Sequence, residues 1–220
     1  MHKNNSTQSG FTIVELMIST VIFSMVLLLL TTGVIGFTKS YYKGITSTNT
    51  QRVARVISDD ITQTIQSSSQ VPYFFKPLPT PDGYGGFCVG NVSYAYHLGY
   101  ELVNGTPDSK LAQTNQSLLK NTSFACSSEP DAKTLYTDLA KPGSLSQEML
   151  SPSMRIADLE VAQINPPDSI VYSVRLTVAY GDDDLLNDPT STSPSCAPVS
   201  GSQFCAVSSL GTVVRKLINQ

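Results

Sequence analysis

The side chains of this sequence that could do chemistry fall into four sets: one isolated glutamate, two histidines, four cysteines and a run of acidic residues. A carboxylate within an apolar stretch needs a cationic partner or a function, cysteines form disulfides or bind metals, and clustered carboxylates are hard oxygen ligands. The four sets are Glu15; His2 and His97; Cys88, Cys126, Cys196 and Cys205; and Asp182, Asp183, Asp184, Asn187 and Asp188.

The histidines and glycines form no pattern that is typical of an enzyme. His97 lies in the alternating segment SYAYHLGY, which favours a strand side chain over a general base, and His2 lies in the polar segment at the N-terminus. The glycines of DGYGGFCVG lack the lysine of a phosphate-binding loop and predict a turn. The net charge of −3 leaves no basic surface of the kind that nucleic acids require. We therefore expect neither an enzyme nor a nucleic-acid-binding protein.

The acidic segment GDDDLLND is a candidate metal site. Asp182, Asp184, Asn187 and Asp188 could supply oxygen ligands for calcium in a loop between strands, although their spacing differs from that of an EF-hand. An acidic, solvated turn is the simpler interpretation. Apart from calcium, we expect no metal and no cofactor.

All four cysteines follow the apolar N-terminal stretch, and they are spaced too widely for a CxxC motif. This favours disulfides in an oxidising compartment, with free thiols packed in a cytosolic core as the alternative. Pairing of neighbours would join Cys88 to Cys126 and Cys196 to Cys205. It is one of three pairings that four cysteines allow.

An apolar segment near the N-terminus is long enough to cross a membrane. Between Phe11 and Phe37 the only charged residue is Glu15, and about 20 apolar residues in a helix span a bilayer core. A secretory signal peptide has a shorter apolar stretch that ends in small residues at a cleavage site, and no such site follows Leu30. Residues 11–37 are therefore predicted to form a transmembrane helix.

The residues around Gly10 resemble the prepilin motif of type IV pilins and type II secretion pseudopilins. The polar leader MHKNNSTQSG ends in glycine, phenylalanine follows, and glutamate is fifth in FTIVELMIS. The resemblance implies that prepilin peptidase cuts between Gly10 and Phe11, and that the new amino group of Phe11 is N-methylated. The implied partners are other pilin subunits, bound through the N-terminal helix, the peptidase, an inner-membrane assembly platform and a separate ATPase.

The resemblance also implies an assembly role for Glu15. A carboxylate within a membrane helix costs about 3 kcal/mol on insertion scales. In the family its partner is the N-terminal ammonium of an adjacent subunit, so Glu15 is expected to pair with the Phe11 ammonium of its neighbour. The alternative is a glutamate that is favoured only by the positive end of its own helix.

The implied location is the inner membrane, where the precursor spans once with its C-terminal domain outside the cytoplasm, and then a surface pilus or a periplasmic pseudopilus. The charge count gives the opposite orientation, because Lys39, Lys43, Arg52 and Arg55 follow the span and only Lys3 precedes it. We give the longer, more specific motif precedence over the count.

The helix is expected to continue beyond the membrane over residues 38–66, where apolar residues recur at helical spacing. This stripe is predicted to pack on an exported domain formed by residues 67–220. Gly33 and Gly36 weaken the helix where it leaves the span. The stripe consists of Ile45, Val53, Val56, Ile57, Ile61 and Ile65.

Alternation of apolar residues predicts an antiparallel sheet in the C-terminal third. Residues 67–153 are predicted to be mostly loop, with a strand at Val92–Tyr100 and a short helix at Leu135–Ala140. The fold class is α+β, a long N-terminal helix packed on a C-terminal antiparallel sheet, as in pilins. The C-terminal strands are expected at Met154–Ile164 and Ile170–Tyr180, joined by a turn at Asn165–Asp168, and at Phe204–Val207 and Gly211–Ile218.

Within the family, QRVARVISDDITQTI and SSLGTVVRKLINQ resemble the larger minor pilins, including the J-type pseudopilins. We therefore interpret the protein as a structural minor pilin with a leader at residues 1–10, acting in initiation at the filament tip or in surface contact. The alternatives are a major pilin or competence pseudopilin, and a single-span, membrane-anchored adhesin or receptor in which Gly10–Phe11 stays uncleaved.

Overall fold

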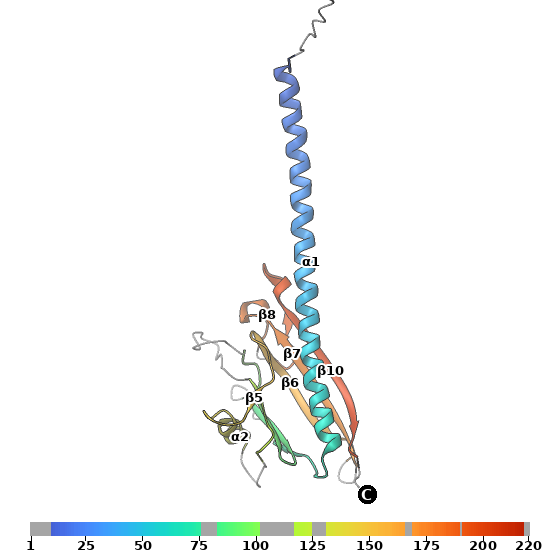
Figure 1. Ribbon diagram of the computed structural model, residues 1–220, viewed down its shortest axis with the longest axis vertical. Helices are drawn as coiled ribbons and strands as arrows, with labels where there is room; N and C mark the ends of the chain where they lie inside the picture. The colour runs from blue at the N-terminus through green and yellow to red at the C-terminus, as the bar shows by residue number, and fades with distance from the viewer. Residues whose placement is uncertain are drawn as a thin grey trace, which may run out of the picture. The chain divides into compact units, whose positions relative to one another are not determined.

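The computed structural model describes residues 10–75, 83–101, 117–124, 131–165, 169–189 and 191–217. The chain forms two compact units, Met1–Tyr41 and Tyr42–Gln220. A long helix is followed by a five-stranded antiparallel sheet with a short helix, and then by a three-stranded antiparallel sheet (Figure 1). The predicted α+β class, a long N-terminal helix with a C-terminal antiparallel sheet, is confirmed.

Helix α1 runs from Ile13 to Ser67, close to the predicted range of residues 11–66. The first proline of the sequence is Pro72, so no ring interrupts the backbone hydrogen bonds of the helix. Gly33 and Gly36 do not break it either. The helix ends at Ser67, the first of three consecutive serines, whose hydroxyls compete for backbone hydrogen bonds.

The buried face of α1 agrees only in part with the predicted stripe. Ile57, Ile61 and Ile65 are fully buried, as expected, but Ile45 and Val56 are exposed. At 3.6 residues per turn, these two lie about 160° and 140° around the helix from Ile61, so they point away from the core. The face is completed by smaller residues that the apolar pattern did not include: Thr50, Ala54 and Ser58.

The first sheet occupies the region that was predicted to be mostly loop. Its five strands are antiparallel and adjacent in chain order, and helix α2, Ala132–Leu139, covers one face through Leu135 and Leu139. The predicted strand at Val92–Tyr100 and the predicted helix at Leu135–Ala140 are confirmed as β3 and α2. The strands are β1 Tyr73–Phe75, β2 Tyr84–Val89, β3 Val92–His97, β4 Leu118–Asn121 and β5 Gln147–Glu148.

Two glycines that predicted a turn lie instead within strand β2. A Cβ at Gly85 would lie 2.4 Å from the ring of Tyr96, and one at Gly86 would lie 2.7 Å from the carbonyl oxygen of Tyr94. Glycine is therefore needed here because strand β3 and its aromatic side chains approach the backbone closely.

The second sheet has the strand order β10-β7-β6. Strands β6, Met154–Gln163, and β7, Val171–Tyr180, form the predicted hairpin, while residues 166–168 of its predicted turn lie outside the described residues. The prediction of two separate C-terminal strands was wrong, since one strand, β10, runs from Ala206 to Arg215 in unbroken register with β7. Gly211 pairs within it and does not divide it.

Phe204, predicted to begin a strand, instead ends a short 3-10 helix. It belongs to an excursion between β7 and β10 that also contains a two-stranded sheet. The excursion consists of η1 Asp183–Leu185, β8 Leu186–Asn187, β9 Ser195–Cys196 and η2 Ser202–Phe204.

The main core lies where the C-terminal half of α1 meets the two sheets (Figure 1). Ile57, Ile61 and Ile65 contribute from the helix, with Phe87 and Tyr94 from the first sheet. The second sheet adds Leu176, Val178 and Val214. The predicted packing of the helix on a C-terminal sheet is thus correct, and the first sheet, β1 to β5, also contributes to that core.

Candidate assembly site

The first turn of α1 is closed by Thr12 and Glu15. The Thr12 hydroxyl oxygen accepts a hydrogen bond from the Glu15 N–H at 3.3 Å. In return, the Glu15 carboxylate accepts from the Thr12 N–H at 3.5 Å and from the Thr12 hydroxyl at 3.3 Å. This is the reciprocal arrangement of a capping box, which satisfies backbone donors that have no partner within the helix.

The Glu15 carboxylate is thus held in position by its own helix, without a contact from a neighbouring subunit. Its position in the first turn also puts its negative charge near the positive end of the helix dipole. The sequence signal was available, because T-I-V-E fits the threonine-x-x-glutamate pattern of a capping box. The pairing of Glu15 with the Phe11 ammonium of a neighbouring subunit stays a prediction.

Gly10 and Phe11 precede the helix and are exposed. A Cβ added at Gly10 would meet no atom within 4 Å, and its backbone lies outside the left-handed region. Nothing in the fold around this position therefore requires glycine. Any requirement for glycine at this position would therefore come from another protein that acts on the peptide bond between Gly10 and Phe11.

The N-terminal part of α1 presents apolar side chains on all sides. From Phe11 to Phe37 the large apolar residues are exposed, and α1 is the one helix of the described residues whose length and apolar composition suffice to cross a membrane. Its hydroxyl groups bond to carbonyls of the preceding turn, as Ser19 does to Glu15 at 2.7 Å and Thr31 to Leu27 at 2.8 Å. These polar groups therefore need no water, which suits an apolar environment.

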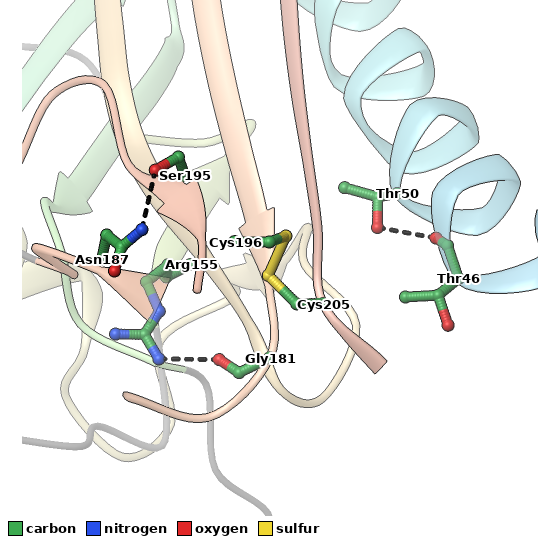
Figure 2. The surroundings of a disulfide bond; sticks show 8 residues. All are labelled: Thr46, Thr50, Arg155, Gly181, Asn187, Ser195, Cys196 and Cys205. Atoms are coloured by element: carbon green, nitrogen blue, oxygen red, sulfur yellow. Dashed lines mark hydrogen bonds between the residues drawn. A yellow bond between two sulfur atoms is a disulfide. The ribbon is translucent and has the colours of Figure 1, made fainter. Parts of the chain in front are cut away.

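The Cys196–Cys205 bond joins strand β9 to the residue that precedes β10. In Figure 2 the disulfide lies beside Thr46 and Thr50 of α1, and the Thr50 hydroxyl donates to the Thr46 carbonyl at 2.9 Å. The bond agrees with the pairing of neighbouring cysteines. Cys88 is also disulfide-bonded, and Cys126 lies outside the described residues.

Arg155 forms a buried cluster that the sequence analysis missed. Its side chain is 1% exposed and pairs with Asp183 and, at 3.3 Å, with Glu101. It also donates to the carbonyl of Gly99 at 3.3 Å and to that of Gly181 at 2.9 Å, the latter drawn in Figure 2. Burial raises the pKa of Glu101 above its ordinary value, and the nearby Arg155 partly offsets this. The guanidinium thus holds the loop after β3 against the loop after β7.

The structure assigns one residue of the acidic segment to this cluster, since Asp183 is the partner of Arg155. Within the described ranges, no group of three or more His, Cys, Asp or Glu side chains is arranged to hold a metal ion. Calcium binding at Asp182, Asp184, Asn187 and Asp188 stays a prediction. His97 is a buried strand residue stacked between Tyr84 and Tyr100, as its alternating segment indicated.

Comparison with known proteins identifies the N-terminal segment. Residues 5–31 match the model of the prokaryotic N-terminal methylation motif, which is the signature of type IV pilins and pseudopilins. No curated protein and no solved structure matches the chain. The motif implies processing by prepilin peptidase and assembly with other pilin subunits. With this motif on the apolar part of α1 and a pilin-like α+β fold, the chain carries the signature of the type IV pilin and pseudopilin family.

Proposed function

We propose that the protein is a structural subunit of a type IV pilus or pseudopilus. The observation that carries the proposal is the methylation motif at residues 5–31, set at the start of a helix whose apolar side chains are exposed from Phe11 to Phe37. So much apolar surface needs a lipid or protein environment, because water disfavours it strongly. A bilayer before assembly and the helices of other subunits afterwards both meet this need.

Prepilin peptidase would cut between Gly10 and Phe11, and the new α-amino group of Phe11 would be methylated. Support comes from Gly10, which is exposed and has open space where a Cβ would lie. The glycine is then a requirement of the peptidase, whose active site must bring its catalytic groups close to this peptide bond. The leader of residues 1–10 would be removed in this step.

Glu15 would bind the Phe11 ammonium of the neighbouring subunit as this subunit leaves the bilayer. The capping box supports this role, because it holds the carboxylate in the first turn, four residues from Phe11 in the chain. Low-dielectric surroundings strengthen the attraction between the two charges and make a wrong register costly. Both hydrogen bonds that Thr12 donates go to the same carboxylate oxygen, so they could persist while the other oxygen of Glu15 accepts from the ammonium.

The remaining segments would divide the work as follows. Residues 11–37 would span the inner membrane and later pack in the filament. Residues 38–66 would join this part to the exported domain of residues 67–220. An assembly platform with a separate ATPase would drive extrusion. The protein would act without catalysis, as a minor pilin at the tip or in surface contact. The resemblance of residues 51–65 and 208–220 to larger minor pilins supports that finer role.

The test is mass spectrometry of the N-terminus of the protein recovered from membranes and from sheared surface filaments, in cells with an active prepilin peptidase. We expect an N-methylated Phe11 start in the filament fraction. The matched variant Gly10→Val should remain uncleaved and membrane-bound, because the peptidase is proposed to require glycine. It should still fold, since a Cβ at position 10 would meet no atom within 4 Å. An intact Met1 start confined to membranes in the unaltered protein would reject the pilin function and favour a single-span adhesin or receptor.

A further inference from the structure

Phe204 contacts Tyr42 at the N-terminal edge of the unit Tyr42–Gln220. Their ring centroids lie 5.5 Å apart. Tyr42 precedes Thr46 and Thr50 by about one and two helical turns, and Figure 2 shows those two residues on the part of α1 that faces the surroundings of the Cys196–Cys205 bond. The disulfide-closed excursion therefore meets α1 at the point where the unit begins.

The turn that carries Phe204 holds apolar side chains at the surface. Phe204 is 42% exposed and Val199 is 45% exposed. The Ser202 N–H donates to the Val199 carbonyl at 3.1 Å, and the Phe204 N–H donates to the Gly201 carbonyl at 2.8 Å. Gly201 has φ 96°, a left-handed conformation that glycine adopts readily. These contacts and the disulfide hold residues 198–204 as a small apolar projection at the surface, called the knob below.

The chain itself limits how far this knob lies from a membrane. The apolar segment ends at Phe37, and the residues from there to Tyr42 are helical, so Tyr42 follows by about 7.5 Å along the axis. The headgroup layer on each side of a bilayer is roughly 5–8 Å thick. The short chain distance therefore allows Tyr42, and Phe204 in contact with it, to reach headgroup depth when residues 11–37 span the bilayer.

The residues around this point have the composition of a membrane interface. Tyr41 and Tyr42 lie between Lys39 and Lys43 in the sequence TKSYYKG. Tyrosine rings favour the headgroup level, and lysines beside a span attract anionic lipids. The knob adds Phe204 and Val199 to this set from a distant part of the chain.

We propose that residues 198–204, together with Tyr42 and Lys43, form a membrane-docking surface that contacts the anionic headgroup layer of the bilayer in which α1 is anchored. The proposal rests on the membrane-anchored precursor of the proposed function. Its occupant is a phospholipid surface, and contact with a neighbouring subunit is the competing outcome. Docking would hold the domain at the membrane before the subunit is extracted into a filament.

The test uses tryptophan, because the sequence contains none. The full chain carrying Phe204→Trp is reconstituted in vesicles of phosphatidylcholine and phosphatidylglycerol brominated near the headgroup end of the acyl chains. Val213→Trp is the matched control: Val213 is 64% exposed on β10, close to Leu217, whose N–H donates to the carbonyl of Gln66 near the other end of the unit's helix. Along the helix, Gln66 lies about 36 Å from Tyr42.

We expect bromolipids to quench Phe204→Trp several-fold more than Val213→Trp. A third variant, Phe23→Trp, reports insertion of α1, and bromines placed deeper in the acyl chains should quench it. Equal, weak quenching at positions 204 and 213 with an inserted helix would overturn the docking surface and leave the pilin function standing. An unquenched Phe23→Trp would contradict the anchored precursor itself, and the docking proposal with it.

Val199→Trp is a second reporter in the same turn, which covers the case in which Phe204→Trp fails to fold. Non-reducing mass spectrometry checks that either variant keeps the Cys196–Cys205 bond, and a variant that keeps it is used as a reporter. Both tryptophans could instead be shielded from solvent only in sheared filaments and show no quenching in vesicles. That result would assign the surface to a neighbouring subunit and overturn the lipid assignment.

Discussion

Thr12 and Glu15 cap each other, so the carboxylate that the assembly hypothesis requires is already in use at the start of its own helix. Capping and intersubunit pairing are different functions of one side chain. The first needs an acceptor that reaches the Thr12 N–H, and the second needs a negative charge. A substitution that keeps the acceptor and removes the charge separates them.

We predict that Glu15→Gln blocks incorporation into filaments nearly as strongly as Glu15→Ala. Glutamine can still close a capping box, but it cannot neutralise the Phe11 ammonium of a neighbour. Thr12→Ala should cost about 1 kcal/mol of helix stability and reduce incorporation only slightly. The measurement is the amount of each variant in sheared filaments relative to membranes, with circular dichroism as the folding control. Normal incorporation of Glu15→Gln would leave capping as the role of Glu15.

Arg155 gives a prediction about stability. Arg155→Ala should destabilise the folded unit by about 3–5 kcal/mol, because Glu101 and Asp183 would lose their buried partner. Arg175→Ala is the control, since its pair with Glu160 is exposed on both sides and is expected to contribute less than about 1 kcal/mol. The measurement is chemical unfolding of the full chain in detergent micelles. Equal effects of the two substitutions would show that Arg155 is not a structural cation.

The Cys196–Cys205 bond should be recovered as a linked peptide pair in non-reducing mass spectrometry. Replacing both cysteines by serine should lower the free energy of unfolding by about 3 kcal/mol, because the unfolded chain regains the entropy of the short loop. Thiols that can be alkylated at both positions in the native protein would contradict the bond. If stability were unchanged after the double replacement, the loop would be held by its other contacts.

The sequence predicted best where one physical signal dominated. The apolar stretch with Glu15 predicted α1, and the alternation in Met154–Gln163 and Val171–Tyr180 predicted the β6–β7 hairpin. In the first sheet only β3 was predicted. Its neighbour β2 escaped prediction because Gly85 and Gly86 lie within it, where close contact with Tyr94 and Tyr96 decides the residue type. That contact is tertiary, so no local pattern contains it.

The candidate site residues and the residues that the structure adds divide in a similar way. Gly10, Phe11 and Glu15 lie in one short motif and could be selected from the sequence. Arg155 and Phe204 could not, because their partners are distant in the chain: Glu101 for the first and Tyr42 for the second. The capping partner Thr12 is predictable from the sequence, because the T-I-V-E spacing of a capping box is local.

Two buried tyrosines predict how stability changes in alkali. Burial raises the pKa of Tyr94 well above its ordinary value of 10.0, and the carboxylate of Asp60, to which its hydroxyl donates at 2.8 Å, adds to this effect. Burial likewise raises the pKa of Tyr96, whose hydroxyl donates to the Leu159 carbonyl at 2.8 Å. Both phenols therefore keep their protons in the folded protein at pH values where the unfolded chain loses them.

The direction of the effect follows from proton binding. Below about pH 10 both states hold these protons, and the contribution to stability is fully present. Above it the unfolded state binds fewer protons, so the free energy of unfolding should fall by about 1.4 kcal/mol per pH unit for each tyrosine. Chemical unfolding at pH values from about 9 to 12, followed together with tyrosinate absorbance, measures this slope. Tyr94→Phe combined with Tyr96→Phe should flatten the slope, and ionisation of both phenols in a protein that remains folded would contradict the prediction.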